Sequence, residues 1–98
     1  MKINELQPLL EKVACLKNNP STQEVFLFVN ERVEGASTPS MGQSACEAIA
    51  SMCNPRAWGD LNVQNFGTKW SDWFAFLEEL EAIAYSCGQA IYDNCAKQ

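Results

Sequence analysis

The chain has 98 residues, of which 47% are hydrophobic and 19% charged. We therefore expect residues 1–98 to form a single domain, because this length is too short for two. Twelve acidic residues against seven basic ones give a net charge of −5, which argues against direct binding of nucleic acid through a basic face. The absence of histidine argues against most zinc sites, proton shuttles and histidine-activated nucleophiles.

Neither a membrane span nor a signal peptide is predicted, because no apolar run is long enough for either. The five cysteines, Cys15, Cys46, Cys53, Cys87 and Cys95, include no C-x-x-C pair, the spacing typical of zinc and redox sites. We expect them to be reduced and mainly buried in a cytoplasmic protein. No metal or other cofactor is predicted.

A first helix is predicted from Glu5 to Lys17, because aliphatic side chains recur every three or four residues along it. Pro20 follows its end, and the residue before a proline is disfavoured in a helix. The apolar stripe of this helix consists of Leu6, Leu9, Leu10, Val13 and Leu16.

A second helix is predicted from Ser21 to Gly35. Ser21 and Glu24 match the capping-box pattern, in which two side chains bind free backbone N–H groups at a helix start. Residues 25–29 are also rich in residue types that favour strands, so a short strand is the competing prediction. The polar residues 30–32 follow at helical spacing and favour the helix.

A third helix is predicted from Ser40 to Cys53. Ser40 and Gln43 repeat the capping pattern, and Pro55 follows the helix end. The predicted inner face consists of Ala45, Ala48, Ile49 and Met52. Residues 56–69 show no helical period, so we expect an irregular segment there.

The clearest prediction is a long helix over residues 70–96, where apolar residues recur in steps of three and four. Gly88 in its interior costs about 1 kcal/mol relative to alanine and marks a bend or a close crossing. The predicted fold is an all-α bundle of four to five helices with a long C-terminal helix. The core stripe of that helix consists of Trp73, Leu77, Leu80, Ala84, Cys87, Ile91 and Cys95.

A second stripe on the C-terminal helix is the strongest functional signal. Phe74, Tyr85 and Tyr92 lie beside the core stripe, with Glu78 and Glu81 along their flank. Two explanations are open: the helix is central and buried on most sides, or the stripe is exposed and binds a partner. Because no basic residue lies between residues 69 and 97, such a partner would have a basic surface.

The same two explanations, core or partner contact, are open for Arg56 and Trp58 in the irregular segment. Tryptophan is more often a core residue than a contact, but recognition residues concentrate in loops between rigid elements. The predicted partner-binding residues are Arg56, Trp58, Phe74, Glu78, Glu79, Glu81, Tyr85 and Tyr92.

Catalysis is not predicted, and no catalytic residue is assigned. Glu78 and Glu79 are adjacent in a helix, so their carboxylates diverge by about a third of a turn. The sequence also lacks a phosphate-binding loop and a nucleophile elbow. We expect a protein that is not an enzyme.

The predicted function is that of a small acidic inhibitor that sterically occludes a basic protein partner, such as a nucleic-acid-handling enzyme or complex. An immunity protein or a phage-encoded antagonist of a host defence system would be an inhibitor of this kind. The alternative is a structural or adaptor homo-oligomer, such as a homodimer, with the C-terminal helix as the self-interface. A thiol sensor is the third hypothesis. Only cysteines on different helices could form a disulfide, because those on one helix lie about 10–12 Å apart.

Overall fold

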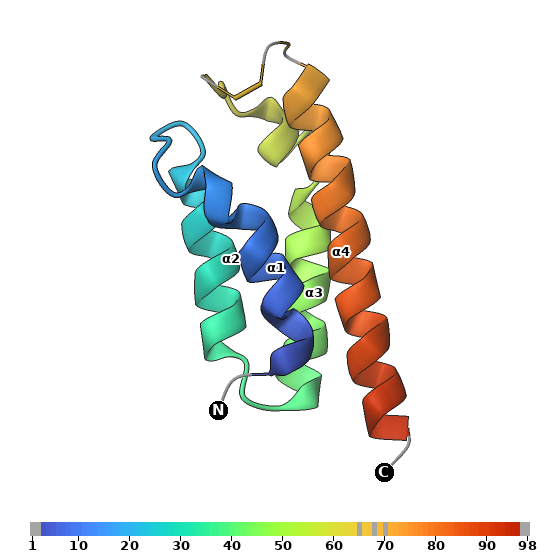
Figure 1. The fold of residues 1–98 in the computed structure, drawn as a ribbon. Coiled ribbons are helices and arrows are strands. Elements are labelled where there is room, and N and C mark those ends of the chain that lie inside the picture. The colour runs from blue at the N-terminus through green and yellow to red at the C-terminus, as the bar shows by residue number, and fades with distance from the viewer. Residues whose placement is uncertain (1–2, 65, 68, 70, 97–98) are drawn as a thin grey trace.

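The computed structural model describes residues 3–64, 66–67, 69 and 71–96. This part of the chain forms a helical bundle without strands (Figure 1), as predicted. The α-helices are α1 (Gln7–Val13), α2 (Gln23–Gly35), α3 (Pro39–Met52) and α4 (Ser71–Ala96). Single 3₁₀ turns lie at Asn4–Leu6, Ala14–Leu16 and Trp58–Asp60.

The first predicted helix is a run of helical turns over residues 4–16, with α1 at its centre and a 3₁₀ turn at each end. Pro8 lies in the first turn of α1, where a missing N–H removes no intrahelical hydrogen bond. Four of the five predicted apolar residues are fully buried, and each contributes about 1.5–3 kcal/mol to folding. These residues are Leu6, Leu9, Val13 and Leu16.

The predicted helix over residues 21–35 is confirmed as α2, and the alternative strand is not formed. Val25, Val29 and Val33 are buried at intervals of four residues, so one face of α2 lies in the core. Leu27 on another face is 48% exposed.

Both predicted capping boxes are wrong. Thr22, not Ser21, is the N-cap of α2. The Ser21 hydroxyl instead accepts a hydrogen bond from the backbone N–H of Gln64, at 2.9 Å, and donates one to Asn19 Oδ1, at 2.7 Å. A tertiary contact 43 residues away therefore replaces the local cap.

At the start of α3, the cap is Thr38 rather than Ser40. Its hydroxyl oxygen accepts a hydrogen bond from the Met41 N–H at 3.2 Å. The cap of α3 therefore lies two residues earlier than predicted, and Pro39 lies in the first turn of the helix.

Helices α3 and α4 run antiparallel and form the largest interface of the bundle. Gly42 near the start of α3 lies beside Ile91 near the end of α4, and Cys46 lies beside Gly88. Gly88 therefore lies where α4 packs on α3, but a Cβ there would meet Cys46 only at ordinary van der Waals distances, so this crossing does not require glycine.

Helix α4 lies at one side of the bundle, packed against α1 and α3 (Figure 1). Its buried face contains six of the seven predicted residues together with Phe76. The seventh, Cys95, is exposed. It lies four residues beyond Ile91, which already faces the first turns of α3.

Trp58 is a core residue, so its predicted role as a partner contact is wrong. Its side chain is 2% exposed and packs edge-on against Phe28 of α2, with ring centroids 5.2 Å apart. Its carbonyl oxygen accepts a hydrogen bond from Trp73 Nε1 at 2.8 Å. The Trp58 side chain thus packs the irregular segment against α2, and the Trp58 carbonyl group links the same segment to α4.

A candidate protein-binding surface on helices α3 and α4

The two tyrosines of the predicted second stripe are exposed. Tyr85 is 64% exposed and Tyr92 is 60% exposed, and Glu78 nearby is exposed as well. Glu81, one turn before Tyr85, is half-buried. The central-helix explanation is therefore wrong, because this side of α4 faces solvent at the edge of the bundle.

We name this exposed side the tyrosine strip and define it by Glu78, Glu81, Tyr85, Gln89 and Tyr92. From its first to its last residue the strip covers fourteen helical steps, or about 21 Å. That length matches about four turns of a partner helix.

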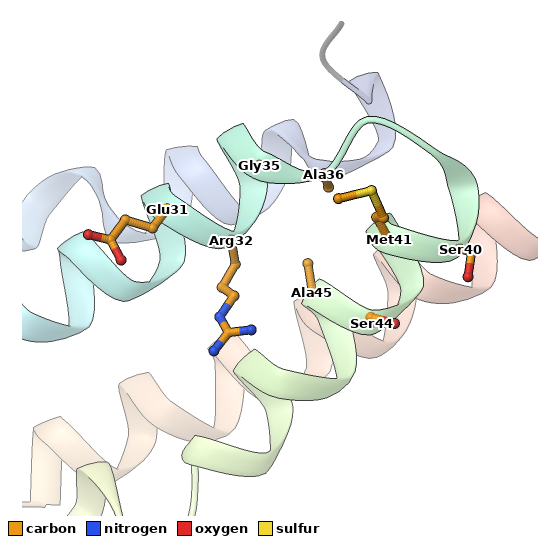
Figure 2. Close-up of a pocket in the computed structure, with 8 residues that line it drawn as sticks. All are labelled: Glu31, Arg32, Gly35, Ala36, Ser40, Met41, Ser44 and Ala45. Carbon is orange, nitrogen blue, oxygen red and sulfur yellow. The ribbon is translucent and has the colours of Figure 1, made fainter.

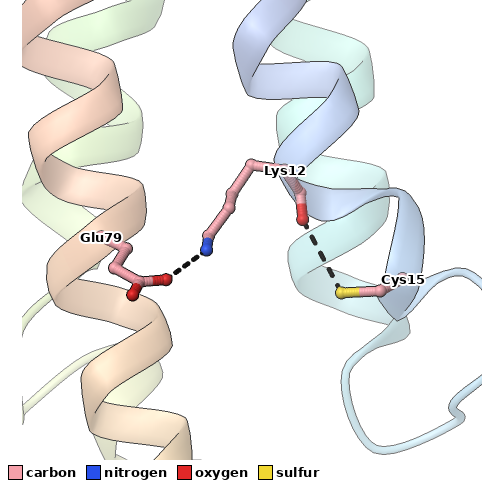
Figure 3. Close-up of polar contacts among 3 residues, drawn as sticks. All are labelled: Lys12, Cys15 and Glu79. Atoms are coloured by element: carbon pink, nitrogen blue, oxygen red, sulfur yellow. Dashed lines mark hydrogen bonds and ion pairs between the residues drawn. The ribbon is translucent and has the colours of Figure 1, made fainter.

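Glu79 lies apart from the tyrosine strip, on the side of α4 that faces α1. Its carboxylate pairs with the Lys12 ammonium group (Figure 3), which also lies 4.8 Å from the centre of the Phe76 ring. The side chain is 65% exposed, so the pair contributes little to stability. Glu79 is a contact between helices and is not part of the strip.

Two other predicted contact residues lie near the irregular segment. Phe74 is half-buried and lines a hollow with residues 59–63. Arg56 is exposed in the turn that follows α3, where its backbone N–H donates to Asn54 Oδ1 at 2.8 Å. Arg56 thus lies at the surface outside α4, whereas Phe74 lies one turn before Glu78 and is half-buried against the irregular segment.

A groove of about 330 Å³ runs between α3 and α4 alongside the tyrosine strip. We call it the α3–α4 groove. Its lining residues are Gln43, Cys46, Glu47, Ala84, Tyr85, Gly88, Gln89 and Tyr92.

Sequence reasoning missed Gln43, Glu47 and Gln89 as site residues. Each is a single polar residue on an amphipathic helix, where a solvent-facing role is the ordinary one. The pairing of α3 with α4 brings them together, and that pairing cannot be read from either helix alone.

The charge of this surface has one sign. Residues 39–52 and 71–96, which form α3 and α4, contain no lysine or arginine. Glu47, Glu78, Glu81 and Asp93 lie on these helices. The carboxylates are therefore left without a basic neighbour on the same two helices, which gives the surface a negative potential.

The thiols of Cys46, Cys53 and Cys87 are unsuited to nucleophilic chemistry. Burial raises the pKa of Cys46 to about 11, with smaller contributions from Cys87 and Glu47. Burial, followed by the charge of Glu81, raises the pKa of Cys53 to about 12. Burial also raises the pKa of Cys87. Near neutral pH these thiols are protonated, whereas the thiolate is the reactive form.

The expectation of mainly buried cysteines is wrong for two of the five. Cys46 and Cys87 are buried and Cys53 is half-buried, but Cys15 and Cys95 are exposed. Cys15 lies on the outer side of the first helical run, where its thiol donates to the Lys12 carbonyl oxygen (Figure 3). All five thiols are free.

A second hollow lies where α2 ends and α3 begins (Figure 2). Arg32 of α2 and Met41 of α3 line it from opposite helices, together with Ser40 and Ser44. The Arg32 guanidinium lies 4.8 Å from the centre of the Phe28 ring. This contact is within the usual range of a cation–π interaction, so Arg32 already has a partner within the fold.

Among the described residues there is no group of three or more cysteines and carboxylates placed to hold a metal ion. Within the same ranges, no helix combines the length and apolar composition needed to cross a lipid bilayer.

Comparison of the chain with protein-family models, curated proteins and solved structures found no match.

Proposed function

We propose that this chain is a protein-binding module that uses the tyrosine strip to cover a basic surface of a partner enzyme or complex. The observation that supports this most directly is the exposure of Tyr85 and Tyr92, at 64% and 60%, beside a groove. Tyrosine is enriched in interface cores because it buries a large area at low entropic cost. Two such residues on one exposed helix side therefore suit recognition.

The charge of α3 and α4 supports a basic partner. Their carboxylates lie on helices without lysine or arginine, and complementary charge accelerates association and suppresses unsuitable partners. A nucleic-acid-handling enzyme presents such a basic surface. On this proposal the chain inhibits by occlusion, as immunity proteins and phage-encoded antagonists of host defence do, and needs no catalytic group.

The same charge weighs against the alternative of a homodimer through α4. Two copies related by a twofold axis would present identical surfaces to one another. Both surfaces would then carry the same negative charge, from carboxylates such as Glu78 and Glu81, and neither α3 nor α4 contains a base to neutralise it. Like charges across an interface oppose association, so a different chain is the better partner.

The proposal is tested by affinity capture from the native cytosol at low salt, with bound proteins identified by mass spectrometry. The test variant is Glu78→Lys/Glu81→Lys, and the matched control is Glu11→Lys/Glu24→Lys. The control also replaces two glutamates by lysines, so it changes the net charge by the same amount. Glu11 and Glu24 are exposed on α1 and α2, away from the tyrosine strip. We expect the test variant to lose the partner and the control to retain it. Equal capture by both variants would show that the strip is not the contact.

A further inference from the structure

The glycine at the centre of the α3–α4 groove is not explained by the packing of the fold. Gly88 lies inside α4, and glycine is the poorest helix former after proline. A close helix crossing would explain it if there were no room for a side chain. However, a Cβ built on Gly88 would lie 3.6 Å from Cys46 Cβ and 4.0 Å from Cys46 Sγ. These are ordinary van der Waals distances, so alanine fits.

The space left by Gly88 lies in the groove, between the two tyrosines. Tyr85 is three residues before Gly88 and Tyr92 is four residues after it, so all three lie on one side of α4. Cys46 and Gly88 both line the groove, and Glu47 lines it from α3. The lining thus combines two aromatic side chains, an acidic side chain and a position without any side chain.

We infer that the α3–α4 groove receives an arginine side chain of the protein partner, seated over Gly88 between Tyr85 and Tyr92. This inference rests on the proposed function and identifies what the partner must present. The occupant is chosen by charge complementarity, because the groove contains a carboxylate and its two helices contain no base.

Arginine fits the groove better than lysine for two reasons. Its guanidinium is planar and stacks on aromatic faces, whereas the lysine ammonium is a strongly hydrated point charge. It also has five N–H donors in a fixed geometry. Glu47 and the amide of Gln43 provide oxygen acceptors on the α3 wall. A side chain at position 88 would occupy the space that the guanidinium needs.

The inference predicts that stability and binding respond in opposite directions to substitution of Gly88. Gly88→Ala should raise Tm by about 5 °C, because it restores helix propensity without a clash. Gly88→Gln should fill the groove with a good helix former and leave the fold intact. The matched control is Gly35→Ala at the end of α2, where a Cβ has no neighbour within 4 Å.

The binding probe is an alanine-based helical peptide with three arginines on one face, titrated into ¹³C,¹⁵N-labelled protein and followed by NMR. We expect the Gly88 amide and the ring protons of Tyr85 and Tyr92 to shift most. A lysine peptide should bind at least about threefold more weakly, and the neutral citrulline peptide should give no shifts. Gly88→Gln should weaken the arginine peptide about tenfold, and Gly35→Ala should leave it unchanged.

Three results would overturn the inference. The first is a shift map centred away from the groove, and the second is wild-type affinity in Gly88→Gln. The third is a dimer of the wild-type protein that Gly88→Gln dissociates in sedimentation, because the occupant would then be a second copy. Failure of the inferred arginine site can be distinguished from failure of the proposed function. If Gly88→Gln captures the cytosolic partner normally and Glu78→Lys/Glu81→Lys does not, the strip is the interface but the arginine site is wrong.

Discussion

Replacing Leu80 by alanine tests the helical phase on which the orientation of the tyrosine strip depends. Leu80 lies in the middle of α4 and is fully buried. Truncation of a buried leucine to alanine costs about 2–5 kcal/mol, because transfer free energy is lost and a cavity remains. The unfolding entropy of a chain of this length is about 0.2 kcal/mol/K, so Tm should fall by about 10–25 °C.

The matched control is Leu27→Ala, which makes the same chemical change at a side chain that is 48% exposed on α2. A surface substitution of this kind changes stability by less than about 0.5 kcal/mol, which corresponds to about 3 °C or less. Thermal unfolding followed by circular dichroism at 222 nm measures both variants. Equal Tm values for Leu80→Ala and the wild type would refute the assignment of Leu80 to the core. The opposite side of α4 would then no longer be the exposed one.

Two further predictions test the packing and the buried thiols. Gly59→Ala should lower the free energy of unfolding by about 1–3 kcal/mol. The Cβ of the alanine would lie 2.9 Å from the Asn54 carbonyl oxygen, which is too close. An unchanged urea midpoint would contradict this close approach. The pKa values of Cys46 and Cys53 are raised to about 11 and 12, above the unfolded value of about 8.5, so the folded state holds these protons more tightly. The contribution of these raised pKa values to the free energy of unfolding is complete below the unfolded-state pKa. It is lost as pH rises through the folded-state pKa. The urea midpoint should therefore fall above about pH 9, and fall less in Cys46→Ala/Cys53→Ala; parallel curves for the two proteins would show that these thiols titrate normally.

The long helix could be predicted from sequence because its signal is local. Steps of three and four residues continue from Trp73 to Ile91, and all the apolar residues at those steps are buried. Cys95 was predicted to be the last buried residue of this stripe, but it is exposed. Burial at that position depends on how far α3 extends alongside α4. Periodicity identifies the face that points inward, but it does not reveal where a neighbouring helix begins.

Features that depend on distant contacts could not be predicted. Ser21 matches a capping box, but its hydroxyl is bound to Gln64, 43 residues away. Trp58 was assigned to an exposed recognition loop, whereas Phe28 and Trp73 hold it in the core. In each case the sequence around the residue is compatible with both outcomes, and a contact made only by the folded chain decides between them.

The candidate site was predictable only where it depends on local spacing and not on distant contacts. Tyr85 and Tyr92 could be placed on one helix side by spacing alone. Whether that side was exposed depended on the position of α4 in the bundle, which the sequence left open. Glu47 and Gly88 became part of one groove only through the antiparallel pairing of α3 with α4.

The most direct test of the account is the association rate of the captured partner with the chain, measured by surface plasmon resonance at 50 and 300 mM salt. If carboxylates of the tyrosine strip steer a basic partner, Glu78→Lys/Glu81→Lys should lower the association rate at least about tenfold at low salt. The difference from the wild type should shrink at high salt, where the charges are screened. Glu11→Lys/Glu24→Lys should associate at close to the wild-type rate. Equal association rates for the two double variants at low salt would contradict the assignment of this surface as the binding site.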